Sequence, residues 1–522
     1  MDYQLPNEVK IVLDKFKKAN YQIYIVGGSV RDLLMNKEVH DWDFTTDAKP
    51  EEILKLFPEG FYDNNFGTVG ISQLSVLSNQ LSDKSQSVVS LSETEKQTTE
   101  KPNSENRKQK TDNQVFEITT MRKEGEYQDF RHPEKVEWTN KIEEDLKRRD
   151  FTMNAIALGI PHVIAIRQLA EKQSQNQIAS SPSADAQGPR NDKLELIDPF
   201  NGQVDIKNKI IKAVGEPDKR FKEDALRLLR AIRFTAQLGF EIEKETFESI
   251  KKNADLIKEI SGERIRDELF KLLGSMNPHS TGSGQAYIGI EKLREAGILK
   301  IILPEVESCF GIMQEGPKHA RTYDIGEHSL LTLKNTPSND PLVRLAALIH
   351  DTGKVKTVKI AEDGNVTFYN HDLVGGGVAK RVADRLKLSK KQADKLFRLV
   401  RWHLFTVDEN QTDSAIRRFI KNVGLENIED MMALRVGDRL GGGTQNPTSW
   451  RMDLFEKRIK EVLKKPFSIS DLKVNGKDVM ETLNIPPSPK VGEVLQKLFE
   501  EVLEDSSKNN KEYLLSRIKN LE

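Results

Sequence analysis

The sequence predicts an α/β head in its N-terminal part, followed by a long body that is mainly α-helical. Three observations predict this arrangement. A strand pattern, a Gly-Gly pair and a helix pattern follow one another in residues 23–34. Further strand-like runs continue to about residue 200. From Asp205 onward, apolar residues recur at intervals of three and four, which is the period of an amphipathic helix. With 522 residues, the chain is long enough for several domains with large buried cores.

The first strand is expected over residues 23–26, a short apolar run rich in β-branched side chains. It ends at Gly27 and Gly28, and Ser29 is expected to cap the helix that follows. A Gly-Gly turn that opens a helix allows backbone N–H groups to approach phosphates.

A second short strand is expected to carry Asp41 and Asp43 on either side of Trp42. Because side chains alternate along a strand, both carboxylates should face the same side. Two ionised carboxylates held close together repel one another unless a cation lies between them. Mg²⁺ prefers such oxygen ligands and keeps positions free for substrate phosphates. Together with the Gly-Gly turn, this pattern indicates metal-assisted nucleotidyl transfer.

Composition limits the remaining possibilities. The formal net charge is −1, so any nucleic-acid binding must come from local patches. Cys309 is the only cysteine, which excludes disulfide frameworks and thiolate zinc sites within one chain. No apolar run approaches the roughly 20 residues that span a bilayer, and the first residues lack a secretory signal pattern. We expect a cytoplasmic protein without membrane segments.

Two polar segments, residues 74–113 and 167–193, are predicted to be flexible loops because they cannot bury enough apolar surface to offset ordering. If they are removed, FGTVGIS joins VFEITTMR, and ALGIPHVIAI joins LELIDPFNGQVDI. Each junction brings together two strand-like runs, as expected for insertions at the tips of β-hairpins. The head is therefore predicted to be intact but to carry two insertions.

The segment GGSVRDLL…HDWDF resembles the nucleotidyltransferase signature of class II CCA-adding enzymes and bacterial poly(A) polymerases, within the DNA polymerase β superfamily. The resemblance implies a polymerase β-like mixed sheet, with Mg²⁺ held by Asp41 and Asp43. It also implies that phosphates are cradled by Gly27, Gly28 and Arg31. An ion pair between Arg31 and Asp32 at the start of the helix is the alternative role for that arginine.

Sites of this superfamily usually place a third carboxylate on a neighbouring strand. Glu117 in VFEITTMR is the candidate, with Phe116 and Ile118 facing the opposite way. An exposed strand glutamate without a catalytic role is the alternative interpretation, and Asp63 is a weaker competitor for the third position.

The segment RRDFT matches a family motif in which Arg148, Arg149 and Asp150 contact the triphosphate and ribose of the incoming nucleotide. The planar fork of arginine suits phosphate because it can donate two parallel hydrogen bonds. A solvated charge run is the alternative. The preceding segment, residues 122–138, resembles the flexible loop of these enzymes.

The segment EDALRLLR is expected to place Glu223, Asp224, Arg227 and Arg230 on one helix. Asp224 and Arg227 would share a face and present an acceptor beside donors, which can imitate a Watson–Crick edge and select CTP or ATP. The segment matches the EDxxR motif of class II CCA-adding enzymes, which makes these two residues the base-reading pair, with Arg230 as a further nucleotide-binding residue. A simple Glu223–Arg227 ion pair is the alternative.

A second centre is indicated in the C-terminal half, where histidines and aspartates follow one another in an order that resembles the HD phosphohydrolase superfamily, an all-helical fold. The residues concerned are His328, His350, Asp351, His371, His403 and Asp438. Such nitrogen and oxygen ligands suit Mn²⁺, Fe, Ni²⁺ or Co²⁺, and Asp351 is placed to bridge two ions that activate a water. The resemblance implies cyclic phosphodiesterase or phosphatase activity on RNA-type ends. A degenerate domain with packed histidines is the alternative.

The predicted organisation is a head (residues 1–200), a helical neck (201–315), an HD domain (316–465) and a C-terminal helical segment (466–522). A basic stretch at residues 380–401 is a candidate tRNA contact. The predicted function is template-independent addition of CCA to tRNA from CTP and ATP. The alternatives are an enzyme that adds only A or only CC, a poly(A) polymerase, and an HD phosphohydrolase or RNA-binding protein. The sequence carries no signal of oligomeric state.

Overall fold

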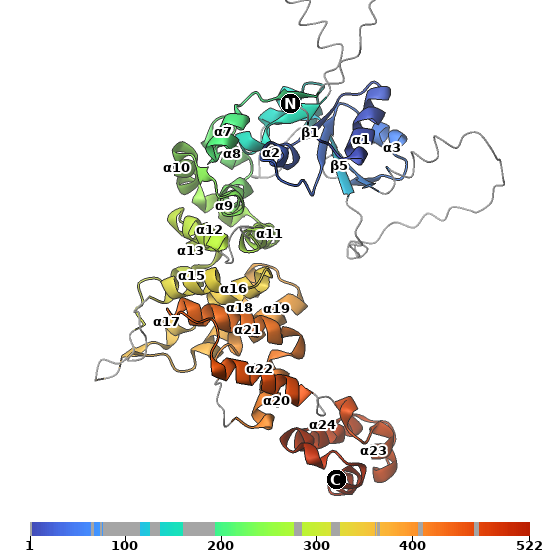
Figure 1. Cartoon of the computed structure of the whole chain (residues 1–522), viewed down its shortest axis with the longest axis vertical. Coiled ribbons are helices and arrows are strands. Elements are labelled where there is room, and N and C mark those ends of the chain that lie inside the picture. Colours follow the sequence, from blue (N-terminus) through green and yellow to red (C-terminus); the bar gives the residue numbers. More distant parts are fainter. Residues whose placement is uncertain are drawn as a thin grey trace, which may run out of the picture. The chain divides into compact units, whose positions relative to one another are not determined.

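The structure is a computed structural model that describes residues 3–63, 67–73, 76, 115–125, 136–159, 194–275, 284–314, 324–360, 362, 366–405, 411–463 and 469–521. Apart from residue 76, the two predicted insertions lie outside these ranges, as do residues 126–135 of the predicted loop. The chain divides into two compact units (Figure 1). The first unit comprises Met1–Ala231 and Phe240–Glu259, and the second comprises Ile232–Gly239 and Ile260–Glu522. The boundaries of the four predicted domains stay a prediction.

A seven-stranded sheet forms the centre of the first unit, with the strand order β3-β4-β5-β2-β1-β8-β9. Its strands are β1 (Ile23–Val26), β2 (Asp43–Thr46), β3 (Phe61–Asp63), β4 (Thr68–Ser72), β5 (Val115–Thr120), β8 (Ala157–Gly159) and β9 (Glu195–Ile197). The pair β2–β5 is parallel and the other five neighbouring pairs are antiparallel. The predicted mixed sheet is therefore confirmed, and all four residues of β1 are buried, as expected for its apolar run.

Both predicted hairpin junctions are confirmed. Strands β4 and β5 pair from Ser72 opposite Val115, the residues that flank the first insertion. Strands β8 and β9 pair from Gly159 opposite Glu195, on either side of the second. The two insertions therefore leave and rejoin the sheet at neighbouring points.

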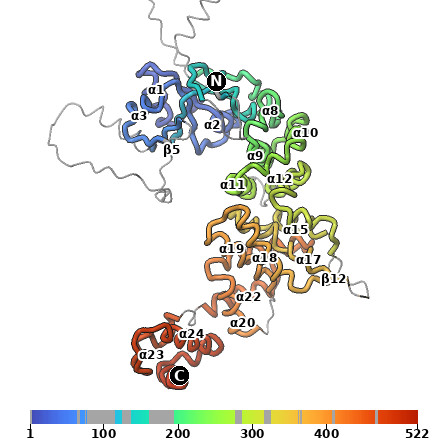
Figure 2. Tube along the Cα trace, turned by 180° about the vertical axis from the view of Figure 1, so that it is seen from behind, coloured from blue at the N-terminus to red at the C-terminus, as the bar shows by residue number. Residues whose placement is uncertain are grey.

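Helices pack around this sheet, and further helices follow it in the chain within the first unit. They are α1 (Asn7–Lys18), α2 (Gly28–Leu34), α3 (Pro50–Leu56), α5 (Ile142–Lys147), α7 (Gly202–Asn208), α8 (Pro217–Glu223), α9 (Leu226–Leu238) and α10 (Lys244–Lys252). Short strand pairs β6 (Arg122–Glu124) with β7 (Val136–Trp138), and β10 (Ile210–Ile211) with β11 (Glu241–Ile242), lie outside the sheet. Helices α1 and α3 lie side by side in both views (Figures 1 and 2), and the rings of Phe16 and Phe57 pack there at 6.0 Å.

The second unit is mainly helical, which confirms the predicted change of period. Its principal helices are α11 (Gly262–Leu273), α12 (Gly284–Glu295), α13 (Leu299–Ile302), α14 (Pro304–Glu307), α15 (Ile325–Asn335), α16 (Pro341–Ile349), α17 (Lys354–Thr357), α18 (His371–Arg385), α19 (Lys390–Arg401), α20 (Asp413–Val423), α21 (Ile428–Gly441), α22 (Trp450–Leu463), α23 (Gly476–Leu483), α24 (Pro489–Glu504) and α25 (Lys511–Lys519). Helices α15, α16, α18, α19 and α21 pack into a bundle beside one small hairpin, β12 (Lys359–Ile360) with β13 (Val366–Thr367).

Helices α23, α24 and α25 pack together near the C-terminal end of the chain (Figure 2). They share a separate apolar cluster that includes Val479, Leu498 and Leu514. In the described ranges, none of the helices has both the length and the apolar composition needed to cross a membrane.

A buried ion pair joins α11 to the end of α9, whose residues from Ile232 onward belong to the second unit. Arg233 donates from Nε to Glu268 Oε2 at 2.6 Å, and both side chains are less than 10% exposed. If one partner loses its charge, the other remains buried without compensation, which is far more costly than losing an exposed pair.

We expect Glu268→Gln to reduce the free energy of unfolding by about 3 kcal/mol, measured by urea denaturation. Lys271→Gln is the matched control, because Lys271 lies 3.8 Å from the same carboxylate but is 58% exposed. It should change stability by less than about 1 kcal/mol. Equal effects of the two substitutions would show that the buried pair is not an important source of stability.

Candidate functional site

The head places two of the predicted carboxylates opposite one another. Asp43 opens β2, and its register partner on the parallel strand β5 is Glu117. Phe116 and Ile118 are buried, so Glu117 faces the other side, as predicted. Strand β3, which carries Asp63, lies two positions beyond β5 in the sheet, and the side chain of Asp63 is outside the described part. The sheet order therefore favours Glu117 over Asp63 as the third carboxylate.

The prediction that one short strand holds both Asp41 and Asp43 is wrong in one respect, because β2 begins at Asp43 and Asp41 precedes it. Trp42 between them is buried. Ser29 was expected to cap α2, but Gly27 occupies that position instead. The hydroxyl of Ser29 donates to the carbonyl oxygen of Asp41 at 3.0 Å and accepts from the backbone N–H of Asp43 at 2.9 Å. Ser29 thus fixes the aspartate segment against the start of α2.

Burial, together with the charges of Glu117 and Asp41, raises the pKa of Asp43 to about 6, against the opposing charges of Arg149 and Arg31. The charges of Glu117 and Asp41 are therefore close enough to disfavour ionisation of Asp43. A divalent cation removes that penalty, and an all-oxygen ligand set suits Mg²⁺. The chemistry of these three residues therefore fits such an ion.

The Gly27 backbone requires glycine. Its φ is +69°, and a Cβ there would lie 3.0 Å from Arg149 Nη1 and 3.6 Å from Asp43 Oδ2. Glycine at this position keeps the space between the arginine and the aspartate open. The ion pair between Arg31 and Asp32, which was the alternative role for this arginine, is present in the structure at 2.9 Å. Arg31 also donates from Nη1 to Asn154 at 3.0 Å.

Arg148 and Arg149 are both held by Asp145, a carboxylate that the sequence analysis missed. Asp145 is fully buried and lies 2.8 Å from Arg148 Nη2 and 3.3 Å from Arg149 Nη2. Burial alone would raise the pKa of Asp145, but the two arginines outweigh it and the pKa is lowered. The spacings of three and four residues on α5 were the available signal. The alternative of a freely solvated charge run does not describe these residues.

Asp150 and Arg230, both predicted to bind nucleotide, contact each other. Arg230 donates from Nε to Asp150 Oδ2 at 2.8 Å, and Asp150 Oδ1 accepts from the backbone N–H of Phe151 and from Asn154. Burial opposes ionisation, yet Arg230 and Asn154 hold the pKa of Asp150 well below its ordinary value. The carboxylate of Asp150 therefore braces the segment after β7 against α9.

The expectation that EDALRLLR forms one helix is wrong. Helix α8 ends at Glu223, Asp224 adopts an extended conformation, and α9 begins at Leu226. The carboxylate of Asp224 accepts from the N–H of Leu226 at 3.1 Å, because aspartate readily caps a helix start. Asp224 and Arg227 are still neighbours, since the N–H of Arg227 donates to the carbonyl of Asp224.

The alternative contact, an ion pair between Arg227 and Glu223, is present at 2.6 Å. Arg227 also donates to the carbonyl oxygens of Arg220 and Arg148, both at 3.1 Å, and is only 9% exposed. Its guanidinium is thus fixed by three acceptors. A cavity of about 280 Å³ lies beside this network and is lined by Lys123, Gly125, Glu144, Lys147, Arg148, Arg220 and Glu223.

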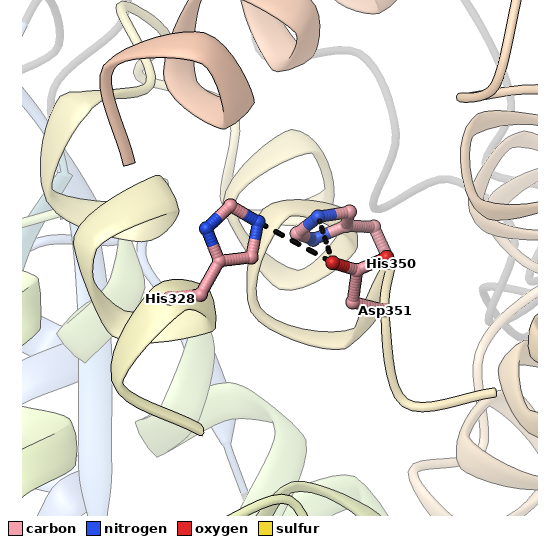
Figure 3. A group of neighbouring side chains, drawn as sticks. All are labelled: His328, His350 and Asp351. Atoms are coloured by element: carbon pink, nitrogen blue, oxygen red, sulfur yellow. Dashed lines mark ion pairs between the residues drawn. The ribbon is translucent and has the colours of Figure 1, made fainter. Parts of the chain in front are cut away.

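The predicted HD ligands come together in the second unit. Asp351 lies at the centre: its Oδ2 is 3.3 Å from His328 Nε2 and 3.2 Å from His350 Nε2 (Figure 3). Its Oδ1 is 3.3 Å from His371 Nε2 and 3.6 Å from His403 Nε2. Asp438 Oδ1 is 3.3 Å from His328 Nε2. One carboxylate thus faces two histidine pairs, one with each oxygen.

The tautomers of three histidines follow from their backbone contacts. The Nδ1 atoms of His350, His371 and His403 lie 2.7–2.8 Å from carbonyl oxygens three residues earlier, so Nδ1 carries the proton and donates. Each Nε2 then presents a lone pair toward Asp351, and in the described part of the chain these three atoms have no hydrogen-bond partner. Two acceptors facing each other require a cation between them.

Metal ions fit this requirement. Two nitrogen or oxygen ligands of one ion, each about 2.0–2.2 Å from it, lie about 3–3.5 Å apart, which matches the separations found here. Backbone acceptors on the opposite ring nitrogen are also the usual support of metal-binding histidines. The six residues therefore fit one or two divalent ions, with Asp351 shared.

Gly353 explains how His371 reaches Asp351. A Cβ on Gly353 would overlap the backbone carbonyl oxygen of His371, so only glycine allows α18 to start this close to the HD turn. Lys354, the next residue, donates to Asp351 Oδ2 at 2.7 Å. Lys354 was not among the predicted residues, although its position three residues after Asp351 was a signal.

The charges of this centre are strongly coupled. Burial raises the pKa of Asp351, but His350 and Lys354 outweigh burial, and the pKa lies well below its ordinary value. Burial lowers the pKa of His328, but Asp351 and Asp438 outweigh it and raise that pKa to about 9. Positive charge is thus strongly favoured between the carboxylates and the imidazoles.

Four family models match the chain. The poly(A) polymerase head domain matches residues 23–81 and 73–169, and the probable RNA- and SrmB-binding site of polymerase A matches residues 239–310. The HD domain matches residues 318–434, and the putative domain 2 of tRNA nucleotidyltransferase matches residues 377–518.

Similar proteins match over all or half of the chain. A CCA-adding enzyme of Ligilactobacillus salivarius is 29% identical over 522 residues, covering 99% of this chain and 98% of that enzyme. A CCA-adding enzyme of Lactobacillus helveticus is 37% identical over 278 residues, covering 53% of this chain and 52% of that enzyme. With the second relative, the match therefore spans about half of each chain.

Solved structures share the fold. The Bacillus stearothermophilus CCA-adding enzyme in complex with CTP matches with a TM-score of 0.59 at 24% identity, covering 99% of this chain and 98% of that one. The Thermotoga maritima CCA-adding enzyme complexed with tRNA_CCA matches with a TM-score of 0.51 at 19% identity, covering 100% of this chain and 97% of that one.

Substitution by alanine should lower the stability of the protein at Gly27 and raise it at Gly28. Gly27→Ala forces a side chain into a positive φ beside Arg149, and we expect it to reduce stability by about 1–3 kcal/mol. Gly28→Ala is the control, because Gly28 is helical and its Cβ would meet only Arg31, at 3.6 Å. It should raise stability by up to about 1 kcal/mol. Thermal unfolding measures both, and a neutral Gly27→Ala would show that the turn tolerates a side chain.

Proposed function

We propose that this chain, which belongs to the family of CCA-adding enzymes and poly(A) polymerases, adds C, C and A to the 3′ end of tRNA without a template, using CTP and ATP. The observation that carries the proposal is the register of Asp43 with Glu117 beside the open Gly27 turn. A relative that matches nearly the whole chain is a CCA-adding enzyme, which favours tRNA as the acceptor. We expect the protein to act in the cytoplasm.

We propose that Asp41, Asp43 and Glu117 hold Mg²⁺. That ion would stabilise charge on the attacking and leaving oxygens. In the reaction, the 3′-hydroxyl of the tRNA forms a bond to the α-phosphorus of the nucleotide, and the bond to the pyrophosphate oxygen breaks. Arg149 lies beside Asp43 and is held by Asp145, so its guanidinium is already in position for the phosphates.

The remaining head residues keep their proposed roles in nucleotide binding. Gly27, Gly28 and Arg31 would contact the phosphates, and Arg148, Asp150 and Arg230 would support the triphosphate and ribose. Asp224 and Arg227 would read the base. Arg227 suits this role because three acceptors fix its guanidinium, and a rigid donor edge discriminates between bases better than a mobile one. The choice between CTP and ATP would then depend on the contacts that hold Arg227, and not on Asp224 and Arg227 sharing one face of a helix.

A second function is favoured by the six HD ligands. We propose that they bind two divalent ions, such as Mn²⁺, Fe, Ni²⁺ or Co²⁺, with Asp351 shared between His328 and His350 on one side and His371 and His403 on the other. Such a centre would hydrolyse phosphate esters at RNA-type ends. The unpartnered Nε2 atoms support it, since a merely packed histidine would satisfy both ring nitrogens.

Asp43→Asn should reduce nucleotide addition by about a thousandfold, because metal stabilisation of the transition state is worth several kcal/mol. The assay contains Mg²⁺, CTP, ATP and a tRNA lacking its last three nucleotides, and the 3′ ends are then sequenced. Glu143→Gln is the control, since Glu143 is an exposed carboxylate of α5 outside the site. Undiminished addition by Asp43→Asn would exclude this head as the catalytic centre.

The same sequencing separates the alternative products. Addition of C, C and A that then stops supports the proposal. Addition of A alone to a tRNA ending in CC would indicate an A-adding enzyme, addition of CC alone a CC-adding enzyme, and long A tails a poly(A) polymerase.

Metal analysis tests the HD centre independently. Apart from Mg²⁺ at the head, we expect two transition-metal ions per chain in the wild type, about one in His350→Ala and in His371→Ala, and none in Asp351→Asn, because Asp351 serves both pairs. His350→Ala should also abolish hydrolysis of 2′,3′-cyclic CMP and 3′-CMP, whereas Asp41→Ala should not. Unchanged metal content in Asp351→Asn would contradict the shared-carboxylate arrangement.

A further inference from the structure

Each carboxylate of the HD centre carries its own cation. Lys354 Nζ lies 2.7 Å from Asp351 Oδ2, and Arg435 Nη1 lies 2.9 Å from Asp438 Oδ2. Both cations are three residues away from the aspartate they contact. Neither is a metal ligand, since ammonium and guanidinium groups have no lone pair to offer at neutral pH.

Lys354 is the more enclosed of the two. Its side chain is 14% exposed, and Nζ also donates to the side-chain oxygen of Gln314. An ammonium group has three donors, and the hydrogen bonds found among the described residues use two of them. Because Lys354 begins α17 directly after the HD turn, its position is fixed relative to Asp351.

Arg435 retains more unused donors. It lies on α21, and its side chain is 26% exposed. Its Nε is buried, and this atom has no hydrogen-bond partner among the residues that the structure describes. The guanidinium also lies 5.6 Å from the ring of Phe405, which limits the directions that it can take. Guanidinium groups held in this way suit phosphate, which accepts two parallel hydrogen bonds from one fork.

The charge balance of the centre points to the kind of ligand it takes. Two carboxylates are matched by two cations, and the other ligands are imidazoles. Each bound divalent ion therefore adds an excess of about two positive charges among largely buried side chains, where water screens poorly. A dianion neutralises twice as much of this excess as a monoanionic diester does.

We propose that Lys354 and Arg435 form an anion site of the HD centre and that its ligand is the phosphate dianion of a terminal phosphomonoester. The inference rests on the second function proposed above. It names the substrate class of that centre and makes the phosphatase reaction preferred over the cyclic diester reaction. In that reaction, the oxygen of water forms a bond to phosphorus, the bond to the nucleoside oxygen breaks, and that oxygen takes a proton from the water.

Binding of inorganic phosphate to the Mn²⁺-loaded protein tests this site, with isothermal titration calorimetry as the readout and metal content measured on the same samples. Asp351→Asn supplies the background from phosphate bound elsewhere. Lys354→Gln and Arg435→Gln should keep the metal and bind phosphate at least about tenfold more weakly, the effect of losing a charged donor. Arg435→Lys, which keeps the charge but not the fork, should lose less.

Arg439→Gln is the matched control. Arg439 lies on the same helix and donates to the carbonyl of Thr448. It should bind phosphate as the wild type does. Retained metal with unchanged phosphate affinity in both Lys354→Gln and Arg435→Gln would overturn the inference and leave the metal centre standing. A wild-type protein that takes up no metal would instead overturn the centre itself, and the inference with it.

Hydrolysis of two nucleotides tests the preference for a dianion. The ratio of kcat/KM for 3′-CMP to that for 2′,3′-cyclic CMP should exceed one in the wild type and fall by about tenfold in Arg435→Gln, because only the monoester presents two charges. A ratio that Arg435→Gln leaves unchanged would overturn the assignment of this arginine to the phosphate.

Discussion

Repulsion between electron-rich groups held at short range is the constraint on which both centres depend. In the head, Asp43 is held beside Glu117 by the register of two parallel strands, and burial adds to the cost of the charge on Asp43. In the HD centre, imidazole lone pairs are turned toward Asp351 because backbone carbonyls accept a hydrogen bond from the other ring nitrogen. Folding energy from the sheet and the bundle maintains both arrangements, because neither is favourable by itself. Cation binding therefore relieves a strain that the fold imposes.

Several nucleotide-binding candidates are bound to one another before any substrate arrives. Asp150 is paired with Arg230, Arg227 with Glu223, and Arg148 with Asp145. Such pairs do not exclude the roles proposed for these residues, because an arginine has five donors and a phosphate needs two. They do mean that three parts of the chain are linked in one network: the segment after β7, the end of α8 and the start of α9. Changing one member alters the positions of the others, so effects on binding and on local stability will be coupled.

The fold could be predicted where local pattern decides it. The apolar run of β1, the pairing of β4 with β5 across the first insertion and the histidine order of the HD bundle all follow from residue type and spacing. The break between two helices within EDALRLLR could not be predicted from the spacing of its residues. An aspartate three residues before an arginine suits one continuous helix, and it equally suits an aspartate that follows one helix and caps the next. The Asp150–Arg230 pair was invisible for a different reason: its members are 80 residues apart and meet only through tertiary packing. Ser29 shows the same limit, since its position allowed a cap, but its partners lie on the segment before β2.

The pairing of Ser72 with Val115 has a consequence for how the length of the intervening connection can vary. The chain leaves and re-enters the sheet at adjacent points, so the entropy cost of closing the intervening loop rises only with the logarithm of its length, about 0.6 kcal/mol for each doubling. The ladder between β4 and β5 fixes Glu117 two residues beyond the junction, whatever length precedes it. Evolution can therefore lengthen or shorten this connection almost freely, and a reporter domain could be spliced in at the same point while the carboxylates keep their register.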